Sequence, residues 1–217
     1  MIAAVVFDLD GVIVDSEQVW DEVRQVYTEE TGGHYGPTAA RDMQGMSSLE
    51  WSRYMAERLG VPGTPGEINA AVVKRMLERY GEDPPLIPGA ADVVRDVAQR
   101  WPVAIASSSN PELIEVVIKA AGLQDAVRVW VSSEEVPRGK PAADVYVEAA
   151  RRLGIDPGDC AAVEDSQNGI RSAKAAGMRV FAIPNPHYPP DASSLAEADV
   201  VLETIRDLPV ALSTVRP

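Results

Sequence analysis

The sequence predicts an α/β fold in which a Rossmann-like parallel sheet carries helices on both faces and an α-helical cap domain is inserted. Two observations predict this class. Short apolar runs alternate with amphipathic stretches of helical length, which is typical of a parallel sheet. The interval between the first two runs greatly exceeds the roughly 30 residues of a strand-helix-strand unit. The 217 residues suffice for one such core and an insert.

The expected strands are continuous apolar runs, as buried parallel strands usually are. The runs cover residues 3–7, 103–106, 127–131, 160–163 and 180–183. Between most of them, apolar residues recur at helical spacing, as at Leu113, Ile114, Val117 and Ile118. We therefore expect helices to cover both faces of the sheet.

The long interval, residues 16–84, is the expected cap, with residues 1–15 and 85–217 forming the core. Val19, Val23, Val26 and Tyr27 share one helical face, and no alternating strand pattern appears, so the cap should be helical. Its hinges are expected near Ser16 and Leu86. Because the insert leaves the sheet where the first strand ends, the cap should cover a site at that edge.

The composition, 46% hydrophobic and 24% charged, is that of a globular protein. The formal charge of −13 disfavours nucleic acids and anionic membranes as partners. The single cysteine, Cys160, permits no intrachain disulfide and favours a reducing compartment. The first apolar stretch, residues 2–7, is too short for a signal sequence or membrane span. We expect a cytoplasmic protein.

Acidic residues end two of the expected strands. Asp8 and Asp10 lie in FDLDG, where strand alternation directs both side chains to one side and Gly11 permits a sharp turn. Glu164 and Asp165 lie in VEDSQNG. Taken singly, each motif is also compatible with a solvated strand end or an acidic capping turn.

Polar residues that suit phosphate follow two other expected strands. Ser107 and Ser108 lie in AIASSSNPEL, where Asn110 and Pro111 mark a helix start with free N–H groups. Lys140 lies in RGKPAADVY. Alone, these motifs also fit an ordinary turn and a surface lysine. A serine-nucleophile reading is disfavoured, because no GxSxG motif surrounds Ser107.

Convergence of these motifs would require a cation. Four carboxylates and one lysine leave a net charge of about −3, and like charges a few ångström apart oppose ionisation. Oxygen ligands favour a hard cation, and Mg²⁺ is the usual partner when phosphate completes its shell. The sequence therefore predicts a magnesium-dependent phosphoryl-transfer site.

The ordered motifs FDLDGVIVDSE, IASSSN, GKPAADVY and VEDSQNGIRSAKAAGM resemble the haloacid dehalogenase (HAD) superfamily, in the phosphatase and β-phosphoglucomutase-like branch with a helical cap after the first motif. The resemblance spans essentially the whole chain. Ala143 departs from it, because a second proline is usual there. The resemblance implies catalytic, phosphate-binding and metal-binding residues: Asp8 as nucleophile and Asp10 as acid and base; Ser107, Ser108 and Lys140 on the phosphoryl group; Asp8, Asp10 through its carbonyl, Glu164 and Asp165 on Mg²⁺.

The cap segment MQGMSSLEW resembles the specificity loop of β-phosphoglucomutases, which have an arginine where this chain has Ser48. Arg41 or Arg53 is a possible substitute, so a mutase stays open as the alternative. Dehalogenation is disfavoured because Asp10 is present, and phosphonate hydrolysis because the cap lacks a suitably placed lysine. A receiver-like signalling module is disfavoured by the cap. The residues considered for substrate contact are Gly45, Ser47, Ser48 and Arg53, with His34, Tyr35 and Trp51.

We therefore expect Mg²⁺-dependent hydrolysis of a small phosphomonoester, a sugar or organic-acid phosphate, through an aspartyl-phosphate. The partner is a small phosphorylated metabolite, and the protein is expected to be a monomer or small homo-oligomer.

Overall fold

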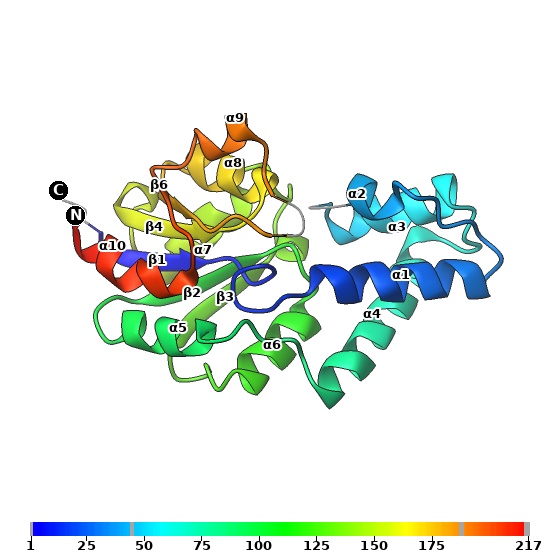
Figure 1. The fold of residues 1–217 in the computed structure, drawn as a ribbon, viewed down its shortest axis with the longest axis horizontal. Coiled ribbons are helices and arrows are strands. Elements are labelled where there is room, and N and C mark those ends of the chain that lie inside the picture. The colour runs from blue at the N-terminus through cyan, green and yellow to red at the C-terminus, as the bar shows by residue number, and fades with distance from the viewer. Residues whose placement is uncertain (1, 44–45, 187–188, 215–217) are drawn as a thin grey trace.

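The computed structural model describes residues 2–43, 46–186 and 189–214. Within them, a parallel sheet has the strand order β3-β2-β1-β4-β5-β6 (Figure 1). The strands are β1 (Ala4–Phe7), β2 (Val103–Ser107), β3 (Val127–Ser132), β4 (Cys160–Glu164), β5 (Arg179–Ala182) and β6 (Val200–Val201). The predicted fold class is confirmed. The short strand β6 was not predicted.

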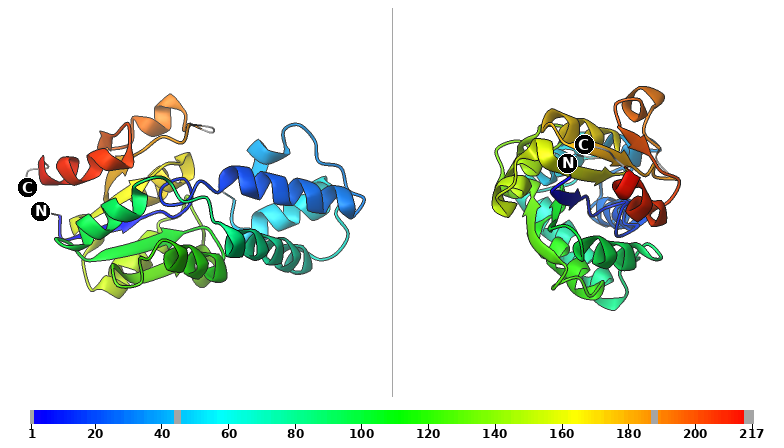
Figure 2. Two further views of the ribbon diagram at one scale, coloured as in Figure 1. Left: turned by 60° about the horizontal axis from the view of Figure 1, so that its bottom comes forward. Right: turned by 90° about the vertical axis from the view of Figure 1, so that its left-hand side faces the viewer.

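Helices cover both faces of the sheet because β1 is apolar on both sides. Val5 and Phe7 face one hydrophobic cluster, which includes α5 (Ala90–Ala98), α6 (Pro111–Ala120) and α10 (Leu208–Thr214). Ala4 and Val6 face the other, with α7 (Asp144–Leu153) and α8 (Gln167–Ala175). All four β1 residues are completely buried. The start of β1 and helix α10 lie at the end of the sheet remote from the cap (Figures 1 and 2).

The predicted cap, residues 16–84, contains helices and no strand among its described residues. Its helices are α1 (Glu17–Glu30), α2 (Ala39–Met43), α3 (Ser48–Arg58) and α4 (Pro65–Glu82). Helix α4 begins after Thr64, whose hydroxyl accepts a hydrogen bond from the Glu67 N–H, and Pro65 occupies the first turn, where no N–H is needed. Apolar residues of α1, α3 and α4 pack into the same cluster as α5 and α6.

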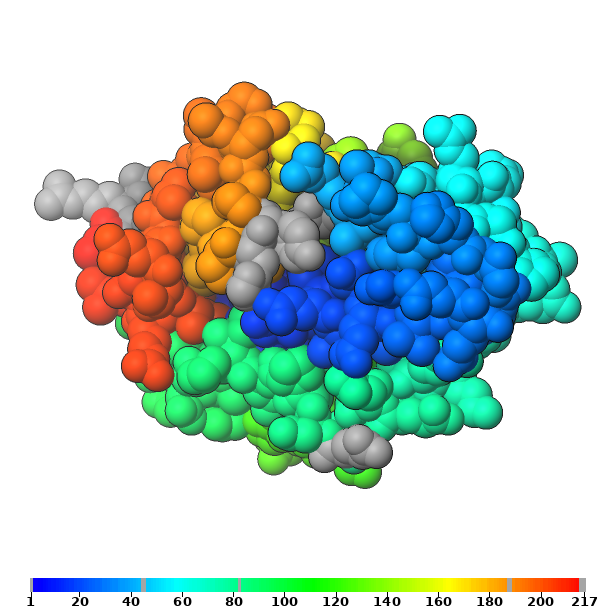
Figure 3. All heavy atoms as spheres, turned by 45° about the vertical axis from the view of Figure 1, so that its right-hand side comes forward, coloured from blue at the N-terminus to red at the C-terminus, as the bar shows by residue number. Residues whose placement is uncertain are grey.

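The chain leaves the core and returns to it at adjacent points. The Asp15 N–H donates to the Pro85 carbonyl at 2.8 Å, and the Ile87 N–H donates to the Ile13 carbonyl at 2.9 Å. The cap therefore projects from the carboxyl edge of the sheet, and its atoms adjoin those of the core (Figure 3). The division into a core of residues 1–15 and 85–217 and a cap of 16–84, with hinges near Ser16 and Leu86, remains a prediction.

Short helices complete the described chain: η1 (Ser133–Glu135), η2 (Pro157–Asp159), α9 (Ala192–Leu195) and η3 (Ile205–Asp207). Over the described ranges, we find no helix whose length and apolar character would let it cross a membrane.

Candidate active site

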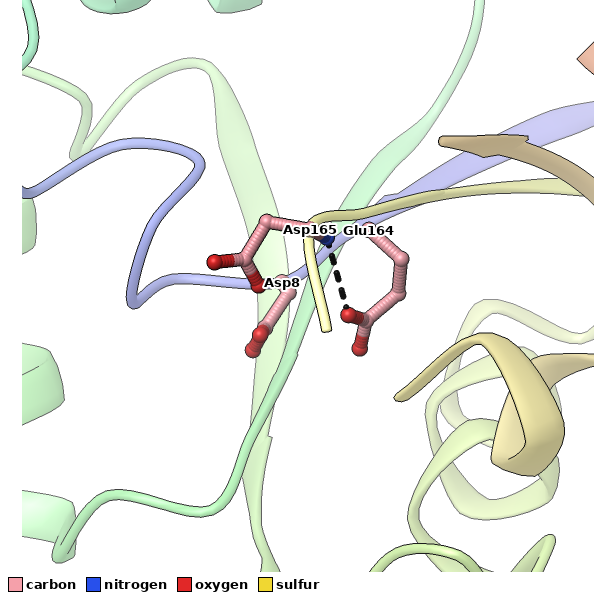
Figure 4. A group of neighbouring side chains, drawn as sticks. All are labelled: Asp8, Glu164 and Asp165. Atoms are coloured by element: carbon pink, nitrogen blue, oxygen red, sulfur yellow. Dashed lines mark hydrogen bonds between the residues drawn. The ribbon is translucent and has the colours of Figure 1, made fainter. Parts of the chain in front are cut away.

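Three carboxylates from neighbouring strands meet at the carboxyl edge of the sheet. Asp8 follows β1, Glu164 ends β4 and Asp165 comes next (Figure 4). The register pairs Phe7 with Val163, and the Asp8 N–H donates to the Val163 carbonyl at 2.9 Å. One oxygen from each carboxylate lies within 4.8 Å of the others, and all three residues are buried. The strand ends thus bring together acids that lie far apart in sequence.

The absence of a side chain at two glycines makes room for these carboxylates. Gly11 has a φ of +73°, and a Cβ there would lie 1.7 Å from Asp165 Oδ2. Gly169 lies in the first turn of α8, where a Cβ would lie 1.8 Å from Glu164 Oε1. Both contacts are far below any permitted approach. The site therefore depends on glycine at both positions.

Lys140 supplies the positive charge inside the cluster. Its Nζ lies 2.9 Å from Asp8 Oδ1 and 2.6 Å from Glu164 Oε1, and its side chain is 3% exposed. Burial alone would lower the pKa of Lys140, but the charges of Asp8 and Glu164 outweigh burial and raise that pKa above its ordinary value. Lys140 therefore stays an ammonium and keeps a fixed place beside Asp8.

Glu164 is held from several directions. Its carboxylate accepts hydrogen bonds from the Tyr146 hydroxyl at 2.7 Å, the Asp165 N–H at 3.0 Å and the Ser166 N–H at 3.2 Å. Glu164 is completely buried and does not line the cavity above Asp8. Its contacts fix the position of Lys140.

The charge balance of the cluster fits a divalent cation. Three carboxylates and one ammonium leave a formal charge of −2 in a buried space. Burial and the charge of Glu164 both raise the pKa values of Asp8 and Asp165. A bound divalent cation would neutralise this excess, and carboxylate oxygens are the ligands that hard cations such as Mg²⁺ prefer. Asp8 and Asp165, which line the cavity, are the residues best placed to hold it.

Asp10 lies outside this group of three, and serine hydroxyls hold its carboxylate. Ser16 donates to one of its oxygens, while Ser107 and Ser109 donate to the other at 3.2 and 2.7 Å. Asp10 still lines the cavity together with Asp8. The side chain is therefore positioned near the predicted nucleophile without joining the acidic cluster, and a metal contact through its carbonyl remains a prediction.

The two predicted phosphate-binding serines differ in position. Ser107 is completely buried, accepts a hydrogen bond from the Ser109 N–H at 2.9 Å and does not line the cavity. Ser108 lines the cavity, as do Ser109 and Asn110. Ser109 was not predicted, although it is the third serine of the motif. The loop after β2 thus presents polar groups to the cavity, and the phosphate-binding role of Ser107 and Ser108 remains a prediction.

Of the predicted or considered cap residues that the structure describes, Trp51 lines the cavity and the others do not. Ser47 caps α3 and donates to Glu50 at 2.7 Å, whereas the Ser48 hydroxyl donates to Glu134 of the core. Arg53 is exposed and does not line the cavity, while Trp51 does line it. Among the other predicted or considered cap residues, His34, Tyr35 and Arg41 lie away from the lining, and Gly45 falls outside the described residues.

Sequence reasoning missed the main cap contribution, which comes from one face of α1. Glu17, Trp20 and Arg24, at positions i, i+3 and i+7, line the same cavity as Asp8, Asp10 and Asp165. The signal in the sequence is an arginine on the same helical stripe as a tryptophan. The complete lining of this cavity is Asp8, Asp10, Glu17, Trp20, Arg24, Met43, Met46, Trp51, Ser108, Ser109, Asn110, Lys140, Asp165, Ser166 and Asn168.

Comparison with known proteins shows the family. Residues 2–177 match the sequence model of the haloacid dehalogenase-like hydrolase family. The chain therefore belongs to this family and is a hydrolase. The expected resemblance is confirmed. Hexitol phosphatase B of Escherichia coli K12 is 32% identical over 214 residues, which cover 95% of this chain and 94% of that protein.

Two further similarities bear on the architecture. The bifunctional riboflavin kinase/FMN phosphatase of Arabidopsis thaliana is 30% identical over 208 residues, which are 95% of this chain and 54% of that protein, so the chain spans about half its length. The crystal structure of CbbY from Rhodobacter sphaeroides in complex with phosphate superposes on this chain with a TM-score of 0.84 and 26% sequence identity. The superposition covers 96% of each chain.

Proposed function

We propose that the protein is a Mg²⁺-dependent phosphatase that hydrolyses a small phosphomonoester through an aspartyl-phosphate. The observation that carries this proposal is the buried pair of Asp8 and Lys140, 2.9 Å apart, at a cavity that Asp10 and Asp165 also line. The similarity to hexitol phosphatase B supports a phosphate ester as substrate.

Asp8 is the proposed nucleophile. One carboxylate oxygen forms a bond to phosphorus as the phosphorus-oxygen bond of the ester breaks, which gives an aspartyl-phosphate and an alkoxide. Lys140 offsets negative charge on both the nucleophile and the transferring group. Mg²⁺ bound at the acidic cluster would stabilise the same developing charge as a Lewis acid.

Asp10 is the proposed acid and base. In the protonated form it gives its proton to the departing alkoxide; as a carboxylate it then takes a proton from the water that attacks the aspartyl-phosphate, which releases phosphate and restores Asp8. The hydroxyls of Ser16, Ser107 and Ser109 hold the Asp10 side chain for this exchange. The two aspartates thus have separate tasks at one cavity.

Hydrolysis is favoured over a mutase reaction by the position of the cap residues. A mutase must hold the second phosphate of a bisphosphate, yet the Ser48 hydroxyl is engaged with Glu134. Arg41 and Arg53 are exposed and do not line the cavity. Neither arginine is therefore placed to replace the missing cation.

A panel of phosphomonoesters with Mg²⁺ tests the proposal. Asp8→Asn should abolish phosphate release, whereas Asp125→Asn, at an exposed position, should leave it unchanged. Full activity of Asp8→Asn, or activity that persists after complete chelation with EDTA, would refute the proposal. Incubation with β-glucose 1-phosphate and a trace of bisphosphate separates the alternative, since a mutase forms glucose 6-phosphate and a phosphatase forms free phosphate.

A further inference from the structure

Arg24 lies in an unusual environment for an arginine on an amphipathic helix. It is 8% exposed and lines the cavity between two tryptophans of the cap. Its guanidinium carbon lies 4.6 Å from the ring centroid of Trp20 and 4.9 Å from that of Trp51, and the two centroids are 5.8 Å apart. Aromatic faces stabilise a desolvated cation. The guanidinium is therefore held in one orientation before any ligand binds.

One hydrogen-bond donor of Arg24 is unsatisfied among the described residues. Its Nε is buried and has no hydrogen-bond partner among the described residues. Buried polar groups are almost always paired, and a guanidinium has several donors in a fixed plane. Because Arg24 lines the same cavity as Asp8, a bound substrate is the natural source of acceptor oxygens.

Glu17 supplies the complementary group on the same face of α1, seven residues before Arg24. It lines the cavity near Asp10, and burial raises its pKa to about 7, although the charge of Arg24 acts in the opposite direction. The cap therefore offers an arginine that donates and a carboxyl group that accepts. Their combined charge lies between zero and +1.

This pair fits hydroxyl groups better than a second anion. A hydroxyl both donates and accepts, so neighbouring hydroxyls can bond to Arg24 and Glu17 together. A second phosphate would gain from Arg24 but would be repelled by ionised Glu17 and by Asp10. The apolar side chains of Met43 and Met46 line the same cavity and suit a carbon chain.

We propose that Glu17 and Arg24 form the subsite that selects the substrate, by hydrogen bonding to the hydroxyl groups of a phosphorylated polyol or open-chain sugar. This inference rests on the proposed phosphatase function, because it places the ester at Asp8 and the hydroxylated end under the cap. Both are specificity-determining residues and take no part in bond making or breaking.

Three esters distinguish recognition of hydroxyl groups from recognition of a carbon chain or of a second phosphate. They are sorbitol 6-phosphate; hexyl phosphate, which has the same chain length but no hydroxyl groups; and fructose 1,6-bisphosphate. Arg24→Met should lower kcat/KM for sorbitol 6-phosphate by about 10- to 100-fold, mainly through KM, because charged hydrogen bonds are lost. The change for hexyl phosphate should stay below about 3-fold. Glu17→Leu, which keeps Arg24 and both tryptophans, should lower kcat/KM for sorbitol 6-phosphate by about 3- to 10-fold.

Arg75→Met is the matched control, since Arg75 also lies over an aromatic ring of the cap, 5.0 Å from the centroid of Tyr27, but away from this cavity. It should change none of the three rates. Equal losses on sorbitol 6-phosphate and hexyl phosphate would overturn the inference, as would a loss confined to the bisphosphate. If the wild type hydrolyses no ester, the proposed function fails as well; normal hydrolysis without this selectivity refutes the subsite alone.

Discussion

Replacement of Lys140 by methionine tests how much one buried ammonium stabilises the acidic cluster. Methionine keeps an unbranched side chain of similar length but has no charge. Lys140 is 3% exposed and lies 2.6 Å from Glu164 and 2.9 Å from Asp8. Without it, the formal charge of the three carboxylates and the ammonium changes from −2 to −3. The variant therefore has buried carboxylates without their partner.

The expected loss follows from this geometry. Removing one partner of a buried ion pair typically costs about 3–5 kcal/mol. For a protein of this size, each kcal/mol lowers Tm by about 2–4 °C, so Lys140→Met should lower Tm by roughly 6–20 °C. Adding Glu164→Gln should recover part of the loss, because it removes one of the two carboxylates left unpaired.

Chemical and thermal unfolding at pH 7 in EDTA measure the effect, with Lys174→Met as the matched control. Lys174 also forms a 2.9 Å ion pair, with Asp199, but the two side chains are 34% and 35% exposed. Exposed pairs contribute about 0–1 kcal/mol, so the control should unfold almost as the wild type does. A loss for Lys140→Met no larger than that for Lys174→Met would refute the reasoning.

Three further outcomes are expected. Gly169→Ala should destabilise the protein and abolish phosphate release, because the new Cβ would lie 1.8 Å from Glu164 Oε1. The control Gly66→Ala, whose Cβ would have nothing within 4 Å, should be as stable as the wild type. Circular dichroism measures the stability of both variants, and phosphate release measures their activity. The pKa of Glu17 is raised from its ordinary value of 4.5 to about 7 in the folded state, so the folded state binds a proton more tightly than the unfolded state does. The free energy of unfolding should therefore fall as pH rises between these two values, by at most about 3 kcal/mol. Urea titrations at several pH values should show that Glu17→Gln lacks this decline. Asp165→Asn should abolish the rise in Tm that Mg²⁺ gives the wild type; an undiminished rise would place the cation elsewhere.

The fold was predictable because its strands are continuous apolar runs separated by helical periodicity. Each predicted strand agrees with an observed one to within one residue at either end. Strand β6 was missed because Val200 and Val201 form a two-residue strand that is not buried, and so has no run of apolar residues. The convergence of Asp8, Glu164 and Asp165 was predictable because adjacent parallel strands end at one edge of a sheet.

The cap side of the site was predictable only in outline. The sequence indicated helices, but the face that turns toward the cavity depends on how α1 packs against the other helices. A charged residue on such a helix is usually solvated, yet Arg24 is buried because Trp20 and Trp51, from different helices, enclose its guanidinium. That enclosure is a tertiary contact, which helical periodicity does not specify.

The core and the cap therefore contribute different properties to one cavity. The register of β1 with β4 sets the spacing of Asp8 and Glu164, and Lys140 from the core completes that cluster. Arg24 and Glu17 belong to α1 and line the same cavity, where the proposed subsite binds the hydroxyl groups of the ester. Because the predicted nucleophile and its partners belong to the core, substitutions along α1 can change which ester is accepted while leaving the acidic cluster intact. The chemistry is thus built on strand ends, and selectivity is built on a helix face that packs above them.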